Sequence, residues 1–304
     1  MGVGEIFDEA LGLYRENAKL FLSVIWLPAL IITAWTSIAA IAPLYLVEPT
    51  DVGFGIALTW LLLTPVALIA WAYQQAAITY AIAERYLGNP VTAQDVRRGI
   101  AGNMWRIIGS FLLVGTALFA SICVFGMALG VVGALGDMSP YAAAVIVLLG
   151  MCGFSIVALF LAVLLAFVAP VIVVEQAGVL GAVARSVRLG ISRFFRTLGI
   201  LILLGLVSLV LSLVAELAVS VTFLPFGGGQ LFSDEPIISL SGVNALQEGV
   251  KLVLSGALSI LVVPFMSAAI VLTYFDIRIR NEAFDVELLA KNLRREPAAS
   301  EYLL

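Results

Sequence analysis

The sequence contains no histidine, only two cysteines and few charged residues. Without histidine, the chain lacks the usual general base at neutral pH, the commonest metal ligand and the usual proton-relay residue. Cys123 and Cys152 both lie inside apolar runs. This placement argues against a disulfide framework or a CxxC site and predicts that both cysteines are packing residues. We therefore expect a protein that is not an enzyme and that uses no cofactor and no metal.

What the sequence has in abundance is apolar side chains. Of its 304 residues, 62% are hydrophobic and 12% charged, and the mean hydropathy is +1.12. A soluble domain is roughly half apolar and about a quarter charged, so the bilayer is the expected solvent. Six apolar runs reach the roughly 20 residues that a membrane-spanning helix needs; they lie near 20–46, 55–83, 107–135, 141–174, 197–224 and 250–275. The sequence thus predicts an all-α, polytopic membrane protein with six transmembrane helices.

The cations follow a strict alternation along the chain. Of the 16 Lys and Arg residues, all but Lys251 lie before the first run, between the second and third, between the fourth and fifth, or after the sixth. The connections on the other side carry mainly acids. Because cytoplasmic loops are rich in Lys and Arg, we expect a multi-pass protein of the cytoplasmic membrane with both termini in the cytoplasm.

An internal repeat is suggested by three amphipathic stretches that each end in a cation and lead into an apolar run. These cations, Lys19, Arg106 and Arg196, lie 87 and 90 residues apart. The spacing predicts one membrane domain over 1–295, made of units 1–88, 89–178 and 179–290, each an interfacial amphipathic helix plus two spans. Residues 296–304 are expected to be a disordered tail. The alternative is that the three stretches are alike by chance, because any multi-span protein alternates apolar runs with basic loops.

The two ends of the chain also resemble a known family. The stretches GEIFDEALGLYRENAKLFL (4–22) and LTYFDIRIRNEAFDVELL (272–289), with ARSVRLGISRFFRTLGIL (184–201) between them, resemble bacterial integral membrane proteins of the "glycerophosphoryl diester phosphodiesterase membrane domain" type. The layout is similar to that of six-span YciC-like inner-membrane proteins. The resemblance implies a six-helix bacterial inner-membrane protein of undefined function. Phosphodiesterase activity in fused relatives belongs to a separate soluble barrel that needs histidine, which this chain lacks.

Two groups of polar residues are candidate sites. The first is a cytoplasmic clamp, in which Glu84, Glu175 and Asp276 pair with basic residues such as Arg106, Arg188 or Arg196, while Arg278 and Arg280 face headgroups or the acids of the first amphipathic helix; the alternative is that these charges are solvated independently. The second is a polar cleft between the fifth and sixth spans. Helical spacing places Ser208, Ser212 and Glu216 on one face, and Lys251, Ser255 and Ser259 on another.

For this second group, a simple interhelical ion pair, or a Glu248–Lys251 pair on one helix, explains the charges equally well. Gln74 and Gln75 lie near the middle of the second span, where they could contact a ligand or bond to a neighbouring helix. Gly126 and Gly130 favour helix packing, and a homo-oligomer stays open. We expect membrane lipids as partners, with a protein partner at the cytoplasmic face, and no nucleic acid.

The sequence therefore predicts a non-enzymatic membrane protein that scaffolds or regulates a membrane partner. The alternative is a protein that binds or transports a lipid or small amphiphile through the polar cleft. A bundle that is open sideways to the bilayer would favour the alternative.

Overall fold

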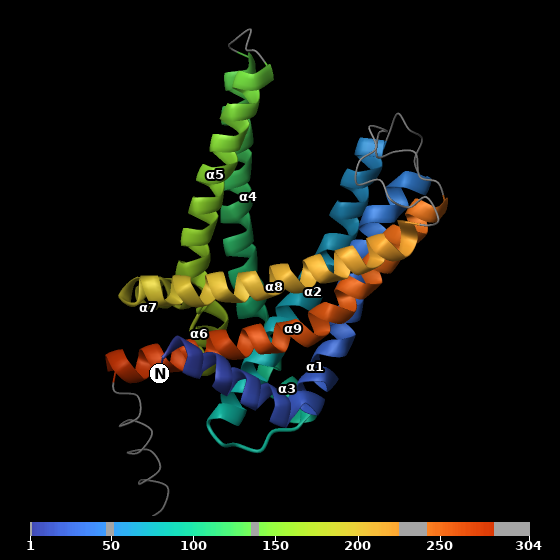
Figure 1. The fold of residues 1–304 in the computed structure, drawn as a ribbon. Coiled ribbons are helices and arrows are strands. Elements are labelled where there is room, and N and C mark those ends of the chain that lie inside the picture. Colours follow the sequence, from blue (N-terminus) through green and yellow to red (C-terminus); the bar gives the residue numbers. More distant parts are fainter. Residues whose placement is uncertain (1, 47–51, 135–139, 225–241, 283–304) are drawn as a thin grey trace, which may run out of the picture.

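The computed structural model describes residues 2–46, 52–134, 140–224 and 242–282, with side chains described for 2–38, 62–116, 125–127, 141, 145–224 and 246–282. Every element in these parts of the chain is an α-helix (Figure 1). In chain order they are α1 (Val3–Leu46), α2 (Val52–Tyr86), α3 (Ala93–Ala101), α4 (Met104–Ala134), α5 (Pro140–Leu165), α6 (Val168–Glu175), α7 (Val179–Ser192), α8 (Phe194–Phe223) and α9 (Gly242–Glu282). The expected disordered tail, 296–304, lies outside the described residues.

Five helical stretches are long and apolar enough to cross a membrane, and they make the chain a membrane protein. They are Val3–Ile38, Leu62–Tyr86, Val145–Glu175, Phe194–Phe223 and Leu246–Glu282. The remaining expected span, 107–135, falls on α4. There the described apolar stretch is Met104–Thr116, which is shorter than the roughly 20 residues that a span needs, and the side chains of 117–124 are not among those described.

Each predicted amphipathic helix is separated from the following span by a break in the backbone. In α1 the break is at Asn17, with φ −117° and ψ 18°, and the Asn17 side-chain amide donates to the carbonyl of Leu13 at 3.1 Å. Gly102 and Asn103 separate α3 from α4. Arg193, with φ −136° and ψ 42°, separates α7 from α8. These breaks come two to three residues before Lys19, Arg106 and Arg196.

The start of α3 has a capping box, which the T-x-x-D pattern of Thr92 and Asp95 predicts. The Thr92 hydroxyl accepts the backbone N–H of Asp95, and the Asp95 carboxylate accepts the backbone N–H of Thr92, so both halves of the capping box are present. Such a box satisfies two backbone donors that a helix otherwise leaves unpaired.

One further break separates α5 from α6, four residues before Pro170. A proline has no N–H to donate to the carbonyl four residues earlier, and its ring clashes with that carbonyl. Ser186 of α7 fills the break, since its hydroxyl donates to the carbonyl of Leu164 at 2.7 Å and accepts the N–H of Phe167 at 3.2 Å. By contrast, α2 and α9 continue through Pro65 and Pro264.

The hydrophobic core lies at one end of the molecule, where the short helices α3, α6 and α7 gather. It is built from the first part of α1, the second half of α2, these short helices and the last turns of α9. We call this region the elbow end. From it the α4–α5 hairpin extends apart from the other long helices (Figure 1), and α8 keeps most of its apolar side chains exposed. The arrangement is open rather than a closed bundle.

Candidate functional site

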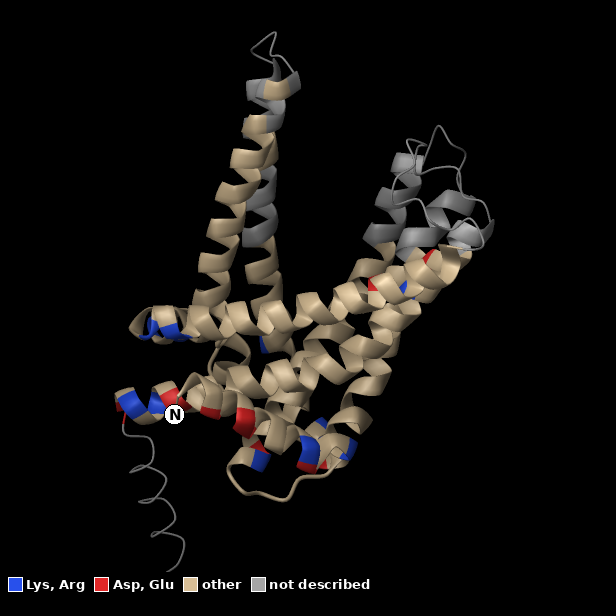
Figure 2. Ribbon diagram, viewed as in Figure 1, with Lys and Arg blue, Asp and Glu red and all other residues tan. Residues whose placement is uncertain are grey.

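Charged residues are concentrated at the elbow end. Figure 2 shows most of the coloured charged positions gathered at this end. The described Lys, Arg, Asp and Glu residues, apart from Glu216, Glu248 and Lys251, lie on the first part of α1, the end of α2, α3, the start of α4, α6, α7, the break at Arg193, the start of α8 and the last turns of α9. Lys251, on the far part of α9, is the exception among the described cations. The alternation seen in the sequence thus becomes a physical separation of charge between the two ends.

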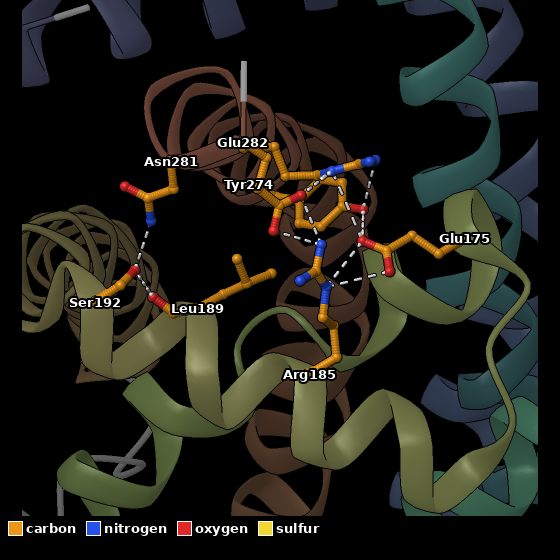
Figure 3. Close-up of polar contacts among 8 residues, drawn as sticks. Glu175, Arg185, Leu189, Ser192, Tyr274, Asn281 and Glu282 are labelled. Atoms are coloured by element: carbon orange, nitrogen blue, oxygen red, sulfur yellow. Dashed lines mark hydrogen bonds and ion pairs between the residues drawn. The ribbon is translucent and has the colours of Figure 1, made fainter. Parts of the chain in front are cut away.

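The first cluster at this end is centred on Glu175, the last residue of α6. Its carboxylate accepts the hydroxyl of Tyr274 at 2.7 Å. It also pairs with Arg185 Nε at 3.3 Å and with Arg278 Nε at 3.7 Å. Glu282 completes the group, because it pairs with Arg185 Nη2 and, at 3.3 Å, with Arg278 Nε (Figure 3). We call these five residues the Glu175 cluster; they join α6, α7 and α9.

The Glu175 cluster is partly shielded from solvent, which indicates that its ion pairs hold the helices together. Arg278 is 8% exposed, its Nη1 donates to the Tyr274 hydroxyl at 3.2 Å, and its guanidinium lies 5.6 Å from the centre of the Tyr274 ring. Burial alone would lower the pKa of Arg185, but the hydrogen bonds and charges of Glu282 and Glu175 raise it above its usual value. A buried charge is tolerated when it is paired and hydrogen-bonded, and here each one is.

The second cluster contains Asp276, Arg196 and Arg280. Asp276 is 5% exposed, and its carboxylate pairs with Arg196 Nη1 from α8 at 2.5 Å and with Arg280 Nε at 3.2 Å. We call these residues the Asp276 cluster. The predicted contact between Asp276 and Arg196 is present, and it fixes the end of α9 to the start of α8.

Other residues of the predicted clamp lie elsewhere. Glu84 accepts a hydrogen bond from the Asn89 side chain at 2.7 Å, and in the described part of the chain it forms no ion pair. Arg106 donates to the carbonyl of Gln176 at 2.7 Å rather than to an acid; Gln176 has φ 53° and forms the left-handed C-cap of α6. Arg188 is exposed and meets none of the three acids.

For Arg278 and Arg280 the sequence predicted contacts with headgroups or with the acids of α1. The ion pairs found in the structure are with carboxylates of the two clusters. The physical reason is helical spacing, since Arg278 reaches Glu282 and Arg280 reaches Asp276 four residues away along α9.

The second candidate site is a groove between α8 and α9, which pack side by side along this stretch. Its volume is about 220 Å³, and it is lined by Ser208, Leu211, Ser212, Ser255, Leu258, Ser259, Val262, Val263 and Met266. The structure therefore brings together all four serines that helical spacing placed on facing surfaces. The Ser208 hydroxyl contacts the Met266 sulfur at 3.1 Å, and Ser259 donates to the carbonyl of Gly256 at 2.7 Å.

An ion cluster lies one helical turn beyond the serines. Lys251 Nζ is 2.6 Å from a Glu216 carboxylate oxygen across the two helices and 3.0 Å from Glu248 on its own helix. The sequence left these two pairings as alternatives, and the structure contains both. The groove thus has an apolar wall with hydroxyl groups and ends at a charged cluster.

The two glutamines do not belong to this groove. Gln74 is 3% exposed, and in the described part of the chain its side-chain oxygen has no hydrogen-bond partner. Gln75 is half-buried. Neither lines the groove between α8 and α9, because both lie on α2, on the core side of the molecule.

The fold and the two sites define an all-helical membrane protein with a charged elbow end and a hydroxyl-lined groove between two of its long helices. Comparison with known proteins gives its family. A family described as "Domain of unknown function (DUF7847)" matches residues 1–277, and the chain belongs to that family. The match includes Asp276 but ends before Arg278, Arg280 and Glu282. No curated protein and no solved structure matches the chain.

Proposed function

We propose that this protein binds a lipid or small amphiphile in the groove between α8 and α9. The observation that carries the proposal is the lining of the groove, in which four hydroxyl groups alternate with Leu, Val and Met side chains. An apolar ligand portion would pack on the aliphatic side chains, and a polar portion would bond to serines or reach the Glu216–Lys251 cluster. Ligand sites of this kind are mostly apolar, with a few placed polar groups.

The surroundings of the groove support access from the bilayer. The outer faces of α8 carry exposed apolar residues, among them Leu209, Leu213 and Leu217. Ser212 and Ser255 are themselves exposed. A lipid-phase ligand could therefore enter sideways from the bilayer. This access favours amphiphile binding over the role that the sequence favoured, which is scaffolding or regulation of a membrane partner.

Scaffolding stays a second proposal, with a non-enzymatic chain offering its elbow end to a cytoplasmic protein. Its support is the concentration of charge at that end (Figure 2). The resemblance to six-span YciC-like proteins is compatible with either role.

We further propose six spans, arranged as three units that each contain an interfacial helix and two spans, with both termini in the cytoplasm. Support for the repeat comes from the backbone breaks at Asn17, at Gly102–Asn103 and at Arg193, each shortly before a cation. Support for six spans comes from α4, whose described apolar stretch continues as helix to Ala134. Support for the orientation is the separation of cations between the two ends.

Binding in the groove is tested by mass spectrometry of amphiphiles that co-purify from native membranes with the wild type and with Ser212→Leu/Ser255→Leu. The double substitution removes two hydroxyls and fills the groove, so the co-purified species should be depleted. The matched control is Ser155→Leu/Thr116→Leu, which alters exposed hydroxyls on α5 and α4. Equal recovery from the groove variant and the control would contradict the proposal.

A further inference from the structure

The four arginines of α7 and the start of α8 fall into two pairs with different surroundings. Arg185 and Arg196 point into the molecule and pair with the carboxylates of the Glu175 and Asp276 clusters. Arg188 and Arg193 are exposed, and neither forms an ion pair with a described residue. Two guanidinium groups at this end of the molecule are thus not used to hold the fold together.

Arg188 lies within an exposed stripe that is otherwise apolar. The stripe follows helical spacing through Leu180, Ala184, Arg188 and Ile191 and continues into Phe195 just after the break. Leu180 is 72% exposed, Ile191 61% and Phe195 84%. The opposite face of α7, with Ala182, Ser186 and Leu189, is buried in the elbow end. A helix with one face in the protein and a second apolar face outside needs a non-aqueous neighbour on that second face.

The stripe is continuous with a surface that lipid must cover. The break at Arg193 leads directly into α8, whose exposed side chains include Ile202, Leu203 and Leu206, and which is apolar enough to span the bilayer. The stripe and Arg193 therefore lie where the apolar surface of α8 begins, and a bilayer that covers α8 would place its headgroups near them. Large apolar and aromatic side chains are typical of helices that lie in the interface.

We propose that Arg188 and Arg193, together with the exposed stripe of α7, bind the phosphate headgroup of an anionic phospholipid. A planar guanidinium donates two parallel hydrogen bonds to phosphate oxygens, while Leu180, Ile191 and Phe195 insert among the upper acyl carbons. This site is separate from the groove between α8 and α9 and does not depend on the function proposed for it.

The chain supplies a matched comparison on α3. Arg97 and Arg98 are also exposed, but the exposed face of α3 itself carries no large apolar side chain, and Arg98 has the Asp95 carboxylate nearby. Arg97→Gln/Arg98→Gln removes the same charge as Arg188→Gln/Arg193→Gln. Of these two pairs, the α7 pair combines an apolar stripe with two guanidinium groups that form no ion pair with a described residue.

The test is native mass spectrometry of the full chain in detergent, titrated with phosphatidylglycerol and, in parallel, with phosphatidylcholine. Arg188→Gln/Arg193→Gln should weaken phosphatidylglycerol binding about 30-fold, which is the combined effect of two interfacial arginines. Arg188→Gln alone should weaken it about fivefold, and Arg188→Lys/Arg193→Lys should weaken it less than the double Gln variant, because lysine keeps the charge but loses the paired hydrogen bonds of the guanidinium. Phosphatidylcholine, whose phosphate charge is balanced by its choline group, should bind more weakly, and its binding should change less in these variants.

Three outcomes would overturn the proposal. One is unchanged phosphatidylglycerol binding in Arg188→Gln/Arg193→Gln. Another is an equal loss in Arg97→Gln/Arg98→Gln, which would mean that net charge alone attracts the lipid. The third is loss of a co-purifying protein while lipid binding is kept, which would make the stripe a protein-docking surface. Should the double variant fail to fold, the single Arg188→Gln variant, at an exposed position, decides the question: unchanged phosphatidylglycerol binding would overturn the proposal.

Discussion

At the scale of single residues, the role of each charged side chain depends on the groups that it contacts. Arg185 and Arg188 are three residues apart on one helix, yet the first is enclosed by two carboxylates and the second is exposed. Sequence spacing alone does not separate them. The direction of each side chain follows from the side of α7 that packs on α6 and α9.

Asp276 is the residue whose replacement should cost most. In Asp276→Asn the buried carboxylate charge is lost, and with it the ion pairs to half-buried Arg196 and to exposed Arg280. We expect a loss of about 2 kcal/mol, within the range for a buried charged group left unsatisfied, seen as a lower melting temperature in detergent.

The control for this substitution is Asp8→Asn, the same chemical change at an exposed position of α1. It should leave the melting temperature nearly unchanged, as surface substitutions usually do. If the two variants have the same melting temperature, the Asp276 cluster contributes no stability beyond that of solvated charges.

Asp95 gives a pH-dependent prediction. Hydrogen bonds from the Thr92 hydroxyl and backbone N–H hold the pKa of Asp95 below its usual value. A lowered pKa in the folded state means that the carboxylate stabilises α3 above about pH 4, and that this contribution is lost as the pH falls through the lowered pKa. Hydrogen-exchange protection of the α3 amides should therefore drop in that acid range. In Asp95→Ala the protection should be low throughout, with no step at that pH.

At the scale of elements, α7 is positioned by close approach to α5. A Cβ on Gly190 would lie 2.8 Å from the carbonyl oxygen of Val163 and 3.1 Å from the Cα of Leu164. Both are backbone atoms, which cannot move aside as a side chain can. Gly190→Ala should therefore separate the two helices and destabilise the protein by about 1–3 kcal/mol, as overpacking usually does.

Gly181 on the same helix is the natural comparison, since its Cβ would meet nothing within 4 Å. Gly181→Ala should be neutral or stabilising by up to about 1 kcal/mol, because alanine favours helix more than glycine does. Thermal melting of the two variants measures the difference. A Gly190→Ala protein as stable as Gly181→Ala would show that the α5–α7 contact is not tight.

The sequence predicted local features of the helices better than it predicted the contacts between distant helices. Cap residues and helical spacing predicted the Thr92–Asp95 capping box and the serine faces of α8 and α9, because these depend on neighbours along the chain. It missed Arg185, Tyr274 and Glu282, which meet only when α7 and α9 pack together from positions about a hundred residues apart. Gly190 could have indicated the close contact between α7 and α5, since a glycine inside an amphipathic helix often marks close packing.

At the scale of the whole molecule, the fold joins a rigid end to an open one. The hydrophobic core, the Glu175 cluster and the Asp276 cluster lie at the elbow end, whereas α8 and the α4–α5 hairpin expose apolar surface beyond it. Regions with few buried contacts open most easily. The groove between α8 and α9 lies on the open side, so the proposed ligand would enter there without disturbing the clusters.

The orientation of this molecule in the membrane can be tested by labelling. Arginines are retained on the cytoplasmic side, so the elbow end should face the cytoplasm and the Lys251 end should face outward. In a chain with Cys123 and Cys152 replaced by alanine, a cysteine at Leu224, the C-cap of α8, should react with a membrane-impermeant maleimide in intact cells. A cysteine at Asn89, between α2 and α3, should react only after the cells are opened. Labelling of Asn89→Cys in intact cells would show that the orientation is the opposite one, with the arginines of α7 against the outer leaflet.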